Sequence, residues 1–432
     1  MNSVFATDFQ KLLFPFASFA PLREIFRFPF VIGFLFCFTG SLRATPPVAQ
    51  FLDDKPLPGQ LVGVGKDWQL TWQTADGKQK QSPAESLVSW GEWKEPGQGP
   101  LVVLSGGGWL VAKRKESDKE LFTLDQEHLT LYSKLFGELK LPLELVAGFA
   151  PHPPSDQAER DALVRKILAA TGKSDALWLE NGDELVGKLT GLKANKLDVQ
   201  AASGVVNVEL AKVAAVVFNP ALAANVRPKG VWAWAGFSDG SRVRLTQLLL
   251  DAKECRATLA GGLELKAELK SEPKPLVALQ PIGGKAVYLS DLKADSYKHI
   301  PYLQLPWPYE LDRNVLGGQL RCGGRTYLKG LGLHSAARLT YVLDQAYRRL
   351  DGEIGIDDAT AGQGSVVFRV YTDDGSGTWK DRFTSPTVRG GQAPLPVSVD
   401  LTGVKRISLL VEFADHGDVQ DHADWLNVRL VK

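Results

Sequence analysis

The sequence contains few cysteines and has almost no excess of charge of either sign. Among 432 residues there are three cysteines, Cys37, Cys255 and Cys322. They are too few and too far apart for a disulfide framework or a cysteine-based zinc site, and at most one disulfide can form. Lys plus Arg number 50 against 49 for Asp plus Glu, so there is no overall basic field of the kind that binds nucleic acid. A phosphate loop and an H-E-x-x-H helix are also absent from the sequence.

Long apolar runs are scarce as well, and the clearest one lies near the start. Phe28 to Phe38 is almost wholly apolar and follows Arg27, but it is well short of the ~20 residues that span a bilayer. Small Ala44 offers a cleavage point. We interpret residues 1–44 as a signal peptide and expect a secreted, periplasmic or cell-envelope protein with no stable membrane span after cleavage. A misassigned start codon before a shorter signal, or an uncleaved anchor, are the alternatives.

Glycine and proline are plentiful, at 42 and 25 residues, and they divide the chain into short alternating segments. Between residues 51 and 280 one pattern recurs, in which a glycine turn is followed by apolar residues with period two. Asn181-Gly182 and Asp239-Gly240 are typical hairpin turns. Since one hairpin buries too little apolar area to be stable alone, we predict mainly β structure. We expect two small antiparallel β units over 51–154 and two more over 172–280, each barrel-like or sandwich-like.

The segment 155–171 departs from this pattern and predicts a helical linker. Its apolar residues have helical spacing, Asp156 and Glu159 form an acceptable capping pair, and Gly172 follows. The region 51–280 is also rich in tryptophan, which could stack on sugars, but at strand spacing we favour a core role for these residues. They are Trp68, Trp72, Trp90, Trp93, Trp109, Trp178, Trp232 and Trp234.

From residue 285 the sequence pattern changes to longer alternating strands. We predict six of them, at 338–343, 349–356, 365–371, 395–401, 406–413 and 425–431. Six strands with turns between them indicate a β-sandwich.

Five sequence blocks in this last third carry a family resemblance. They are YLSDL, GGRTYLKGLGLHS, ARLTYVLDQAYRRLDGEIGIDD, GSVVFRVYTDDG and VEFADHGDVQDHADWLNVRL. Together they resemble the NPCBM family, a module also found beside family 98 glycoside hydrolases. The resemblance covers about 285–432 and implies a galactose-binding-like β-sandwich that is often attached to secreted glycan-active enzymes. The preceding region is similar to repeat-containing segments that stand before such modules in planctomycete proteins.

The residues that could bind a sugar gather in the last of these blocks. A sugar site needs an aromatic face for the apolar side of a pyranose and fixed polar groups for its hydroxyls. The candidates for carbohydrate binding are Asp415, Asp418, Asp421, His422, Asp424, Trp425 and His334. Asp357 and Asp358 follow a strand and are candidate ligands for a metal, with Ca²⁺ as the expected ion. The alternative is structural, because a buried histidine can satisfy backbone carbonyls and periodicity alone does not say which face of the last strand is buried.

These observations favour an exported, non-catalytic carbohydrate-binding protein, with the β units as a spacer or scaffold and a galactose-containing glycan as the expected ligand. A first alternative is an envelope scaffold that binds partner proteins and no glycan. A second is a glycoside hydrolase, which needs two carboxylates about 5 to 9.5 Å apart. Adjacent Asp357 and Asp358 on a strand would point to opposite faces, so they fit that role poorly. Pairing of Cys255 with Cys322 is left open.

Overall fold

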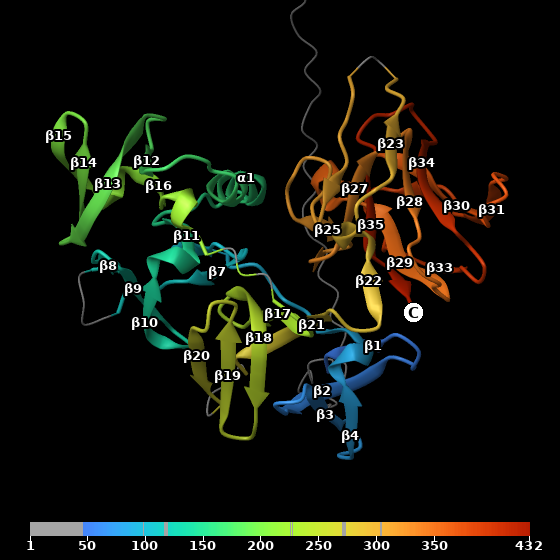
Figure 1. Cartoon of the computed structure of the whole chain (residues 1–432), viewed down its shortest axis with the longest axis horizontal. Helices are drawn as coiled ribbons and strands as arrows, with labels where there is room; N and C mark the ends of the chain where they lie inside the picture. Colours follow the sequence, from blue (N-terminus) through green and yellow to red (C-terminus); the bar gives the residue numbers. More distant parts are fainter. Residues whose placement is uncertain are drawn as a thin grey trace, which may run out of the picture. The chain divides into compact units, whose positions relative to one another are not determined.

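The computed structural model describes residues 46–432 except 98, 116–119, 225, 227, 270–273 and 303–304. The interpretation of residues 1–44 as a signal peptide lies outside the described residues. Over the described residues the chain forms 35 β-strands and one α-helix, which confirms the mainly β, antiparallel fold class (Figure 1). No helix in this part of the chain is long and apolar enough to cross a membrane.

The first β unit shows the plan that the next three follow. Its strands are β1 (Val48–Phe51), β2 (Leu57–Val64), β3 (Gln69–Thr74), β4 (Gln79–Pro83) and β5 (Leu87–Gly91), with the 3-10 turn η1 (Ala84–Ser86) before β5. Strand β1 pairs with both β2 and β5, so the first and last strands close the unit. The long strand β2 bends where its register against β3 shifts, between Leu61 and Gly63.

The other three units close in the same way, by pairing of β6 with β11, β12 with β16 and β17 with β21. The second contains β6 (Leu101–Leu104), β7 (Gly108–Val111), β8 (Phe122–Leu124), β9 (His128–Ser133), β10 (Gly137–Pro142), η2 (Leu143–Leu145) and β11 (Val146–Ala150). The third contains β12 (Asp175–Leu179), β13 (Glu184–Lys193), β14 (Lys196–Ala201), β15 (Gly204–Glu209), η3 (Leu210–Lys212) and β16 (Val213–Val217), followed by η4 (Pro220–Leu222). The fourth contains β17 (Trp232–Phe237), β18 (Arg242–Leu250), β19 (Glu254–Leu259), β20 (Glu264–Glu268) and β21 (Leu276–Ile282).

The four units are hydrogen-bonded to one another. Strand β5 pairs with β21, β11 with β16 and β7 with β18, so 21 strands form one connected network. Gly91 lies where β5 meets β21. It has φ +72°, and a Cβ there would lie 1.9 Å from the carbonyl oxygen of Val277, so this close approach requires glycine.

Four of the tryptophans are core residues, as the strand spacing indicated. Trp72, Trp90, Trp93 and Trp109 are each buried, and their indole N–H groups donate to Ser82 Oγ or to the backbone carbonyls of Gly59, Ser241 and Gly240 respectively. Trp68, Trp178, Trp232 and Trp234 are only partly buried. They remain accessible enough to contact other groups.

The helix α1 (Gln157–Leu168) lies within the segment that the sequence predicts as helical. Asp156 is its N-cap, since its carboxylate accepts a hydrogen bond from the backbone N–H of Glu159 at 2.9 Å. Val164 and Ile167 are buried in a cluster with residues of β6 and β16. The helix therefore covers strands of the second and third units.

The C-terminal part is a β-sandwich of two antiparallel sheets with a short extra hairpin. One sheet contains β22 (Ala286–Tyr288), β24 (Glu310–Leu311), β27 (Gly330–His334), β35 (His422–Val431), β29 (Arg349–Ile356) and β33 (Leu395–Asp400). The other contains β23 (Ser296–His299), β28 (Ala337–Val342), β34 (Arg406–Phe413), β30 (Ser365–Asp373), β31 (Lys380–Thr384) and β32 (Val388–Arg389). The hairpin is β25 (Leu320–Cys322) and β26 (Arg325–Tyr327), and the 3-10 turns are η5 (Leu289–Asp291) and η6 (Asp358–Thr360). Cys255 and Cys322 are both free and buried.

Candidate functional site

Several predicted site residues meet at one end of the sandwich, around the loop between β34 and β35. His334 and His422 face each other across the β27–β35 pair. The carboxylate of Asp421 accepts hydrogen bonds from Ser335 Oγ at 2.7 Å and from the backbone N–H of Ser365 at 2.8 Å. Asp421 is 0% exposed, and these bonds fix the loop against the end of β27 and the start of β30, so its role is to order this end of the sandwich and not to contact a sugar directly.

Two further residues complete what we call the aromatic–histidine cluster, which consists of His299, Trp307, His334 and His422. The Trp307 indole is parallel to the His334 ring, at 4.7 Å between centroids and an interplanar angle of 2°. The backbone N–H of Trp307 donates to His299 Nδ1 at 3.1 Å. His299 Nε2 in turn lies 2.9 Å from the carbonyl oxygen of Ser335, so it carries the proton of a neutral imidazole. Trp307 is thereby held in place from two sides.

His334 and His422 are uncharged near neutral pH. Burial, with a smaller effect of His334, lowers the pKa of His422 to about 4, and burial also lowers the pKa of His334. Burial raises the pKa of the neighbouring Asp421 to about 6. Nδ1 of His422 is buried and has no hydrogen-bond partner among the described residues. Neutral imidazoles can both donate and accept hydrogen bonds, which suits a ligand rich in hydroxyl groups.

Exposed aromatic rings border the same end of the sandwich. Tyr302 is 62% exposed, and its ring lies edge-on to Phe413 at 6.2 Å. Gly417 packs beside the ring of Tyr302, because a Cβ added to this glycine would lie 3.8 Å from the ring. Asp415 is exposed and pairs with Arg389 at 2.6 Å, whereas Asp418 is half-buried. Rings and polar groups therefore share one surface here.

The predicted role in sugar binding is wrong for Trp425 and Asp424, which lie inside the sandwich and not at its surface. Both are 0% exposed, and Trp425 packs edge-on against Phe368 between the two sheets. Strand β35 is central in its sheet, with β27 on one side and β29 on the other. Both edges of β35 are therefore paired, and side chains on both of its faces are buried as well, so neither side chain can contact a sugar at the surface.

Asp357 and Asp358, the candidate metal ligands, are both engaged in hydrogen bonds. Asp357 is fully buried and accepts hydrogen bonds from the backbone N–H groups of Arg321 and Ala359 and from Asn314 Nδ2. Asp358 accepts from the backbone N–H groups of Gly323 and Gly324. Their oxygens serve as hydrogen-bond acceptors that order local turns. Across the described ranges, no group of three or more His, Cys, Asp or Glu side chains is arranged to hold a metal ion.

Trp307 and His299 were not among the residues that the sequence singled out. Trp307 belongs to a Trp-Pro-Tyr tract in the connection between β23 and β24. A tryptophan next to proline in a loop is a recognisable signal, because loops position binding groups without disturbing the core. The contact with His334 and His422 depends on long-range strand pairing, which the local sequence does not reveal.

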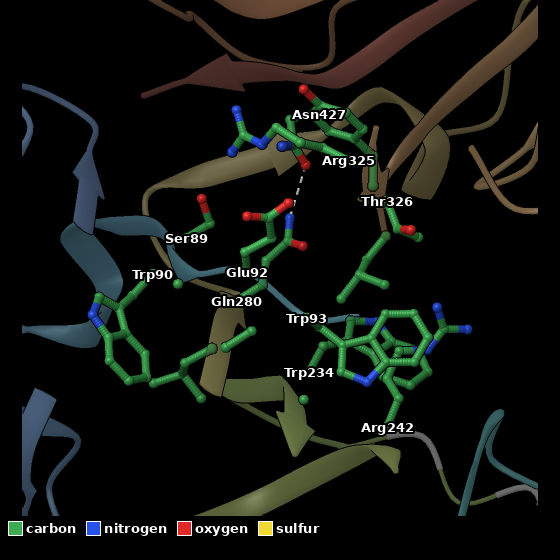
Figure 2. A pocket seen from close by; sticks show the side chains of 16 residues that line it. Ser89, Trp90, Glu92, Trp93, Trp234, Arg242, Gln280, Arg325, Thr326 and Asn427 are labelled. Atoms are coloured by element: carbon green, nitrogen blue, oxygen red, sulfur yellow. Dashed lines mark hydrogen bonds between the residues drawn. The ribbon is translucent and has the colours of Figure 1, made fainter. Parts of the chain in front are cut away.

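A separate cavity lies between β units and the sandwich (Figure 2). It contains about 560 Å³ of space between atoms, part of it open to solvent, and its walls include Trp90, Trp93, Trp234 and Arg325. Gln280 Nε2 donates to Asn427 Oδ1 at 3.0 Å, which joins the fourth β unit to the sandwich on one side of the cavity.

Comparison with known families identifies the sandwich. Residues 285–431 match the NPCBM/NEW2 domain family. The C-terminal third of the chain is therefore an NPCBM domain, as the five sequence blocks implied.

Two curated relatives are similar over a limited part of the chain. A protein named as an endo-alpha-N-acetylgalactosaminidase, from Renibacterium salmoninarum, is 34% identical over 115 residues, which is 27% of this chain and 7% of that protein. Alpha-1,3-galactosidase B of Akkermansia muciniphila is 32% identical over 122 residues, which is 27% of this chain and 15% of that protein. The chain therefore spans only a small fraction of the length of either relative.

Solved structures with similarity include two from Clostridium perfringens. The CBM51-2 and INT domains of ZmpB, in complex with GlcNAc, are 26% identical, cover 44% of this chain and 41% of that chain, and have a TM-score of 0.30. The CBM51 module of GH95, in complex with methyl-galactose, is 24% identical, covers 34% of this chain and 99% of that chain, and has a TM-score of 0.30.

Proposed function

We propose that the protein binds a galactose-containing glycan through its NPCBM domain, at the aromatic–histidine cluster, and that it does not hydrolyse the glycan. The observation that carries this proposal is the position of Trp307, which is half-buried and held against neutral His334 at one end of the sandwich. Indole rings supply the apolar contact surface that a pyranose needs, and neutral imidazoles supply donors and acceptors for its hydroxyls. The names of the two curated relatives, which refer to galactosaminide and galactoside substrates, support this ligand class.

Calorimetric titration of the full-length chain with methyl galactosides and lactose tests the site. We expect weak binding that Trp307→Ala reduces at least about tenfold, because it removes the ring surface. Trp379→Ala is the matched control, since Trp379 is also half-buried in the sandwich but contacts Arg338 and Arg406 instead. Equal losses in both variants would contradict a specific role for Trp307. The titration is repeated with Ca²⁺ and with a chelator to test the expected dependence on calcium.

The absence of catalysis is tested separately with chromogenic galactosides and N-acetylgalactosaminides. We expect no turnover by the full-length chain at any pH between 5 and 8. Turnover that is lost on changing one carboxylate would overturn this part of the proposal. A blank glycan array together with capture of envelope proteins would favour the scaffold alternative.

Export is the third part of the proposal, and it rests on the basic residues, short apolar run and small residue in residues 1–44. N-terminal sequencing of the protein from the envelope or secreted fraction should find processing near Ala44. A mature chain that still begins before Phe28 would contradict cleavage.

A further inference from the structure

Arg242, in strand β18, is an arginine in an unusual environment. Its side chain is only 6% exposed. The guanidinium carbon lies 4.4 Å from the ring centroid of Trp109. It lies 4.9 Å from the centroid of Trp93 and 5.5 Å from that of Trp234 (Figure 2). Nη1 donates to Gln319 Oε1 at 2.8 Å, while Nε has no hydrogen-bond partner in the part of the chain that the structure describes.

Arg242 also lacks an acidic partner. No carboxylate of the described residues is within ion-pairing distance of it, and the two acids that act on it from further away, Glu95 and Asp161, are already paired. Arg321 lies 2.6 Å from Glu95 and 2.7 Å from Asp161, and Arg160 lies 3.4 Å from Glu95. Burial lowers the pKa of Arg242 to about 10, so the group remains charged near neutral pH. A buried cation without an anion is costly.

The side chain borders a hollow that is separate from the aromatic–histidine cluster. This hollow contains about 680 Å³ of space between atoms, part of it open to solvent, and it is lined by Trp234, Arg242, Asp312 and Arg313 among others. About 210 Å³ of it can be occupied by another molecule, which is below the roughly 300–1,000 Å³ of drug-sized sites and limits the occupant to a small group such as a single sugar ring. Arg313 Nη1 donates to the carbonyl oxygen of Gly317, and among the described residues no carboxylate pairs with Arg313.

The one acid in the lining is already neutralised by other groups. Asp312 accepts from the buried ammonium of Lys329 at 2.6 Å and from the backbone N–H of Gly330 at 3.1 Å. The Asp312 carboxylate is therefore neutralised by the Lys329 ammonium. Among the residues that line the hollow, the guanidinium groups of Arg242 and Arg313 have no acidic partner.

Two glycines keep the hollow open beside Trp234. Gly107 and Gly108 both have positive φ, +86° and +82°. A Cβ on Gly108 would lie 3.0 Å from the Trp234 ring, and one on Gly107 would lie 3.5 Å from it. Side chains at these positions would therefore occupy the space next to the indole.

We propose that this hollow is a second sugar site, specific for a sugar that carries an anion, a carboxylate or a sulfate ester. Arg242 and Arg313 bind the anion, since guanidinium groups form strong charge-assisted hydrogen bonds with carboxylates and sulfates. Trp234 packs against the sugar ring. The choice of a sugar as carrier of the anion rests on the proposed function of the NPCBM domain, but the site and its residues are distinct from those of the cluster.

The test compares two probes that differ only at C6, methyl galacturonoside and methyl galactoside, titrated into the full-length chain. We expect the galacturonoside to bind at least tenfold more tightly than the galactoside to this site, with an affinity that falls as NaCl is raised. Methyl galactoside 6-sulfate distinguishes the sulfate ester from the carboxylate as the natural anion. Trp307→Ala should leave the galacturonoside affinity unchanged even if it abolishes galactoside binding, which separates failure of this inference from failure of the proposed function.

Arg313→Gln and Arg242→Lys should each reduce galacturonoside affinity at least tenfold. Arg313→Gln decides the matter alone if Arg242→Lys does not fold, because Arg313 is only partly buried. Arg325→Gln is the control, since Arg325 is exposed and lines the neighbouring cavity of Figure 2. Loss of binding with Arg325→Gln but not with Arg313→Gln, or equal affinity for the two methyl glycosides, would overturn the proposal.

Discussion

Asp357 and Asp424 form a fully buried pair of carboxyl groups in the sandwich. Asp357 accepts three N–H donors, whereas neither oxygen of Asp424 has a donor among the described residues. Burial, together with the nearby charge of Asp357, raises the pKa of Asp424 well above its usual range. Burial also raises the pKa of Asp357, but its three N–H donors favour the ionised form, so we assign the proton of the pair to Asp424.

This assignment predicts an asymmetry between two conservative substitutions. Asp424→Asn should cost less than about 1 kcal/mol of unfolding free energy, because an amide can donate in place of the protonated carboxyl. Asp357→Asn should cost about 2–4 kcal/mol, because an amide offers one acceptor oxygen to three buried donors. Urea unfolding of the full-length chain at pH 7 measures both. Equal costs would contradict the proposed position of the proton.

His422 should make folding stability depend on pH. Its folded pKa of about 4 lies below the ordinary 6.5, so its contribution is fully present above pH 6.5 and is lost as the pH falls toward 4. Asp421 acts in the opposite direction: its folded pKa, raised to about 6 from 3.8, gives a contribution that is present below pH 3.8 and lost as the pH rises through 6.

Between pH 7 and pH 4 the unchanged chain should lose on the order of 2 kcal/mol of unfolding free energy through protonation of His422. The variant His422→Gln should not show this loss. Urea unfolding at intervals of half a pH unit compares the variant with the unchanged chain. His128→Gln is the control, since His128 lies outside the sandwich, on strand β9. If His422→Gln and the unchanged chain gave the same slope over this range, a neutral buried His422 would be ruled out.

At the scale of elements, the strands at the sandwich core were predictable and their neighbours were not. Residues 349–356 and 406–413 are strands as predicted, because apolar residues recur with period two, at Leu350, Ile354 and Ile356 in the first and at Ile407, Leu409 and Val411 in the second. Strand β27, Gly330–His334, is not predicted from the sequence, because Leu331 and Leu333 alternate with glycines, which are depleted in strands, and both of its faces are buried. Strand β35 is likewise buried on both faces, so the pattern of its residues does not show that Trp425 lies in the core and not at a sugar-binding surface.

Pairing between β units is a second feature that local patterns do not contain, and Gly91 tests it. Gly91→Ala would place a Cβ against the carbonyl of Val277 in the β5–β21 pair. Gly77→Ala is the matched control, since Gly77 also has positive φ but nothing lies within 4 Å of its added Cβ. The control should cost about 1–2 kcal/mol for backbone strain alone. Gly91→Ala should cost at least about 2 kcal/mol more by urea unfolding, and equal costs would show that the β5–β21 contact contributes little.

At the scale of the whole molecule, arginines connect the β units with the sandwich. Arg321 pairs with Glu95 and Asp161, and Arg348 and Arg349 each lie 3.0 Å from Asp53. Such partners are far apart in the sequence and carry no pattern that a reading of the chain could detect. Composition and block order were enough for the fold class and for the NPCBM domain, while the aromatic–histidine cluster and the Arg242 hollow appear only once distant segments are placed together.

The central claim is that the end of the sandwich around Trp307 binds a sugar. The measurement that tests it most directly is a crystal structure of the full-length chain with a methyl galactoside or lactose. We predict that the pyranose contacts the Trp307 ring, with hydroxyls within hydrogen-bond distance of His334 or His422. A sugar bound only at another surface of the sandwich, with Trp307 uncovered, would contradict the account.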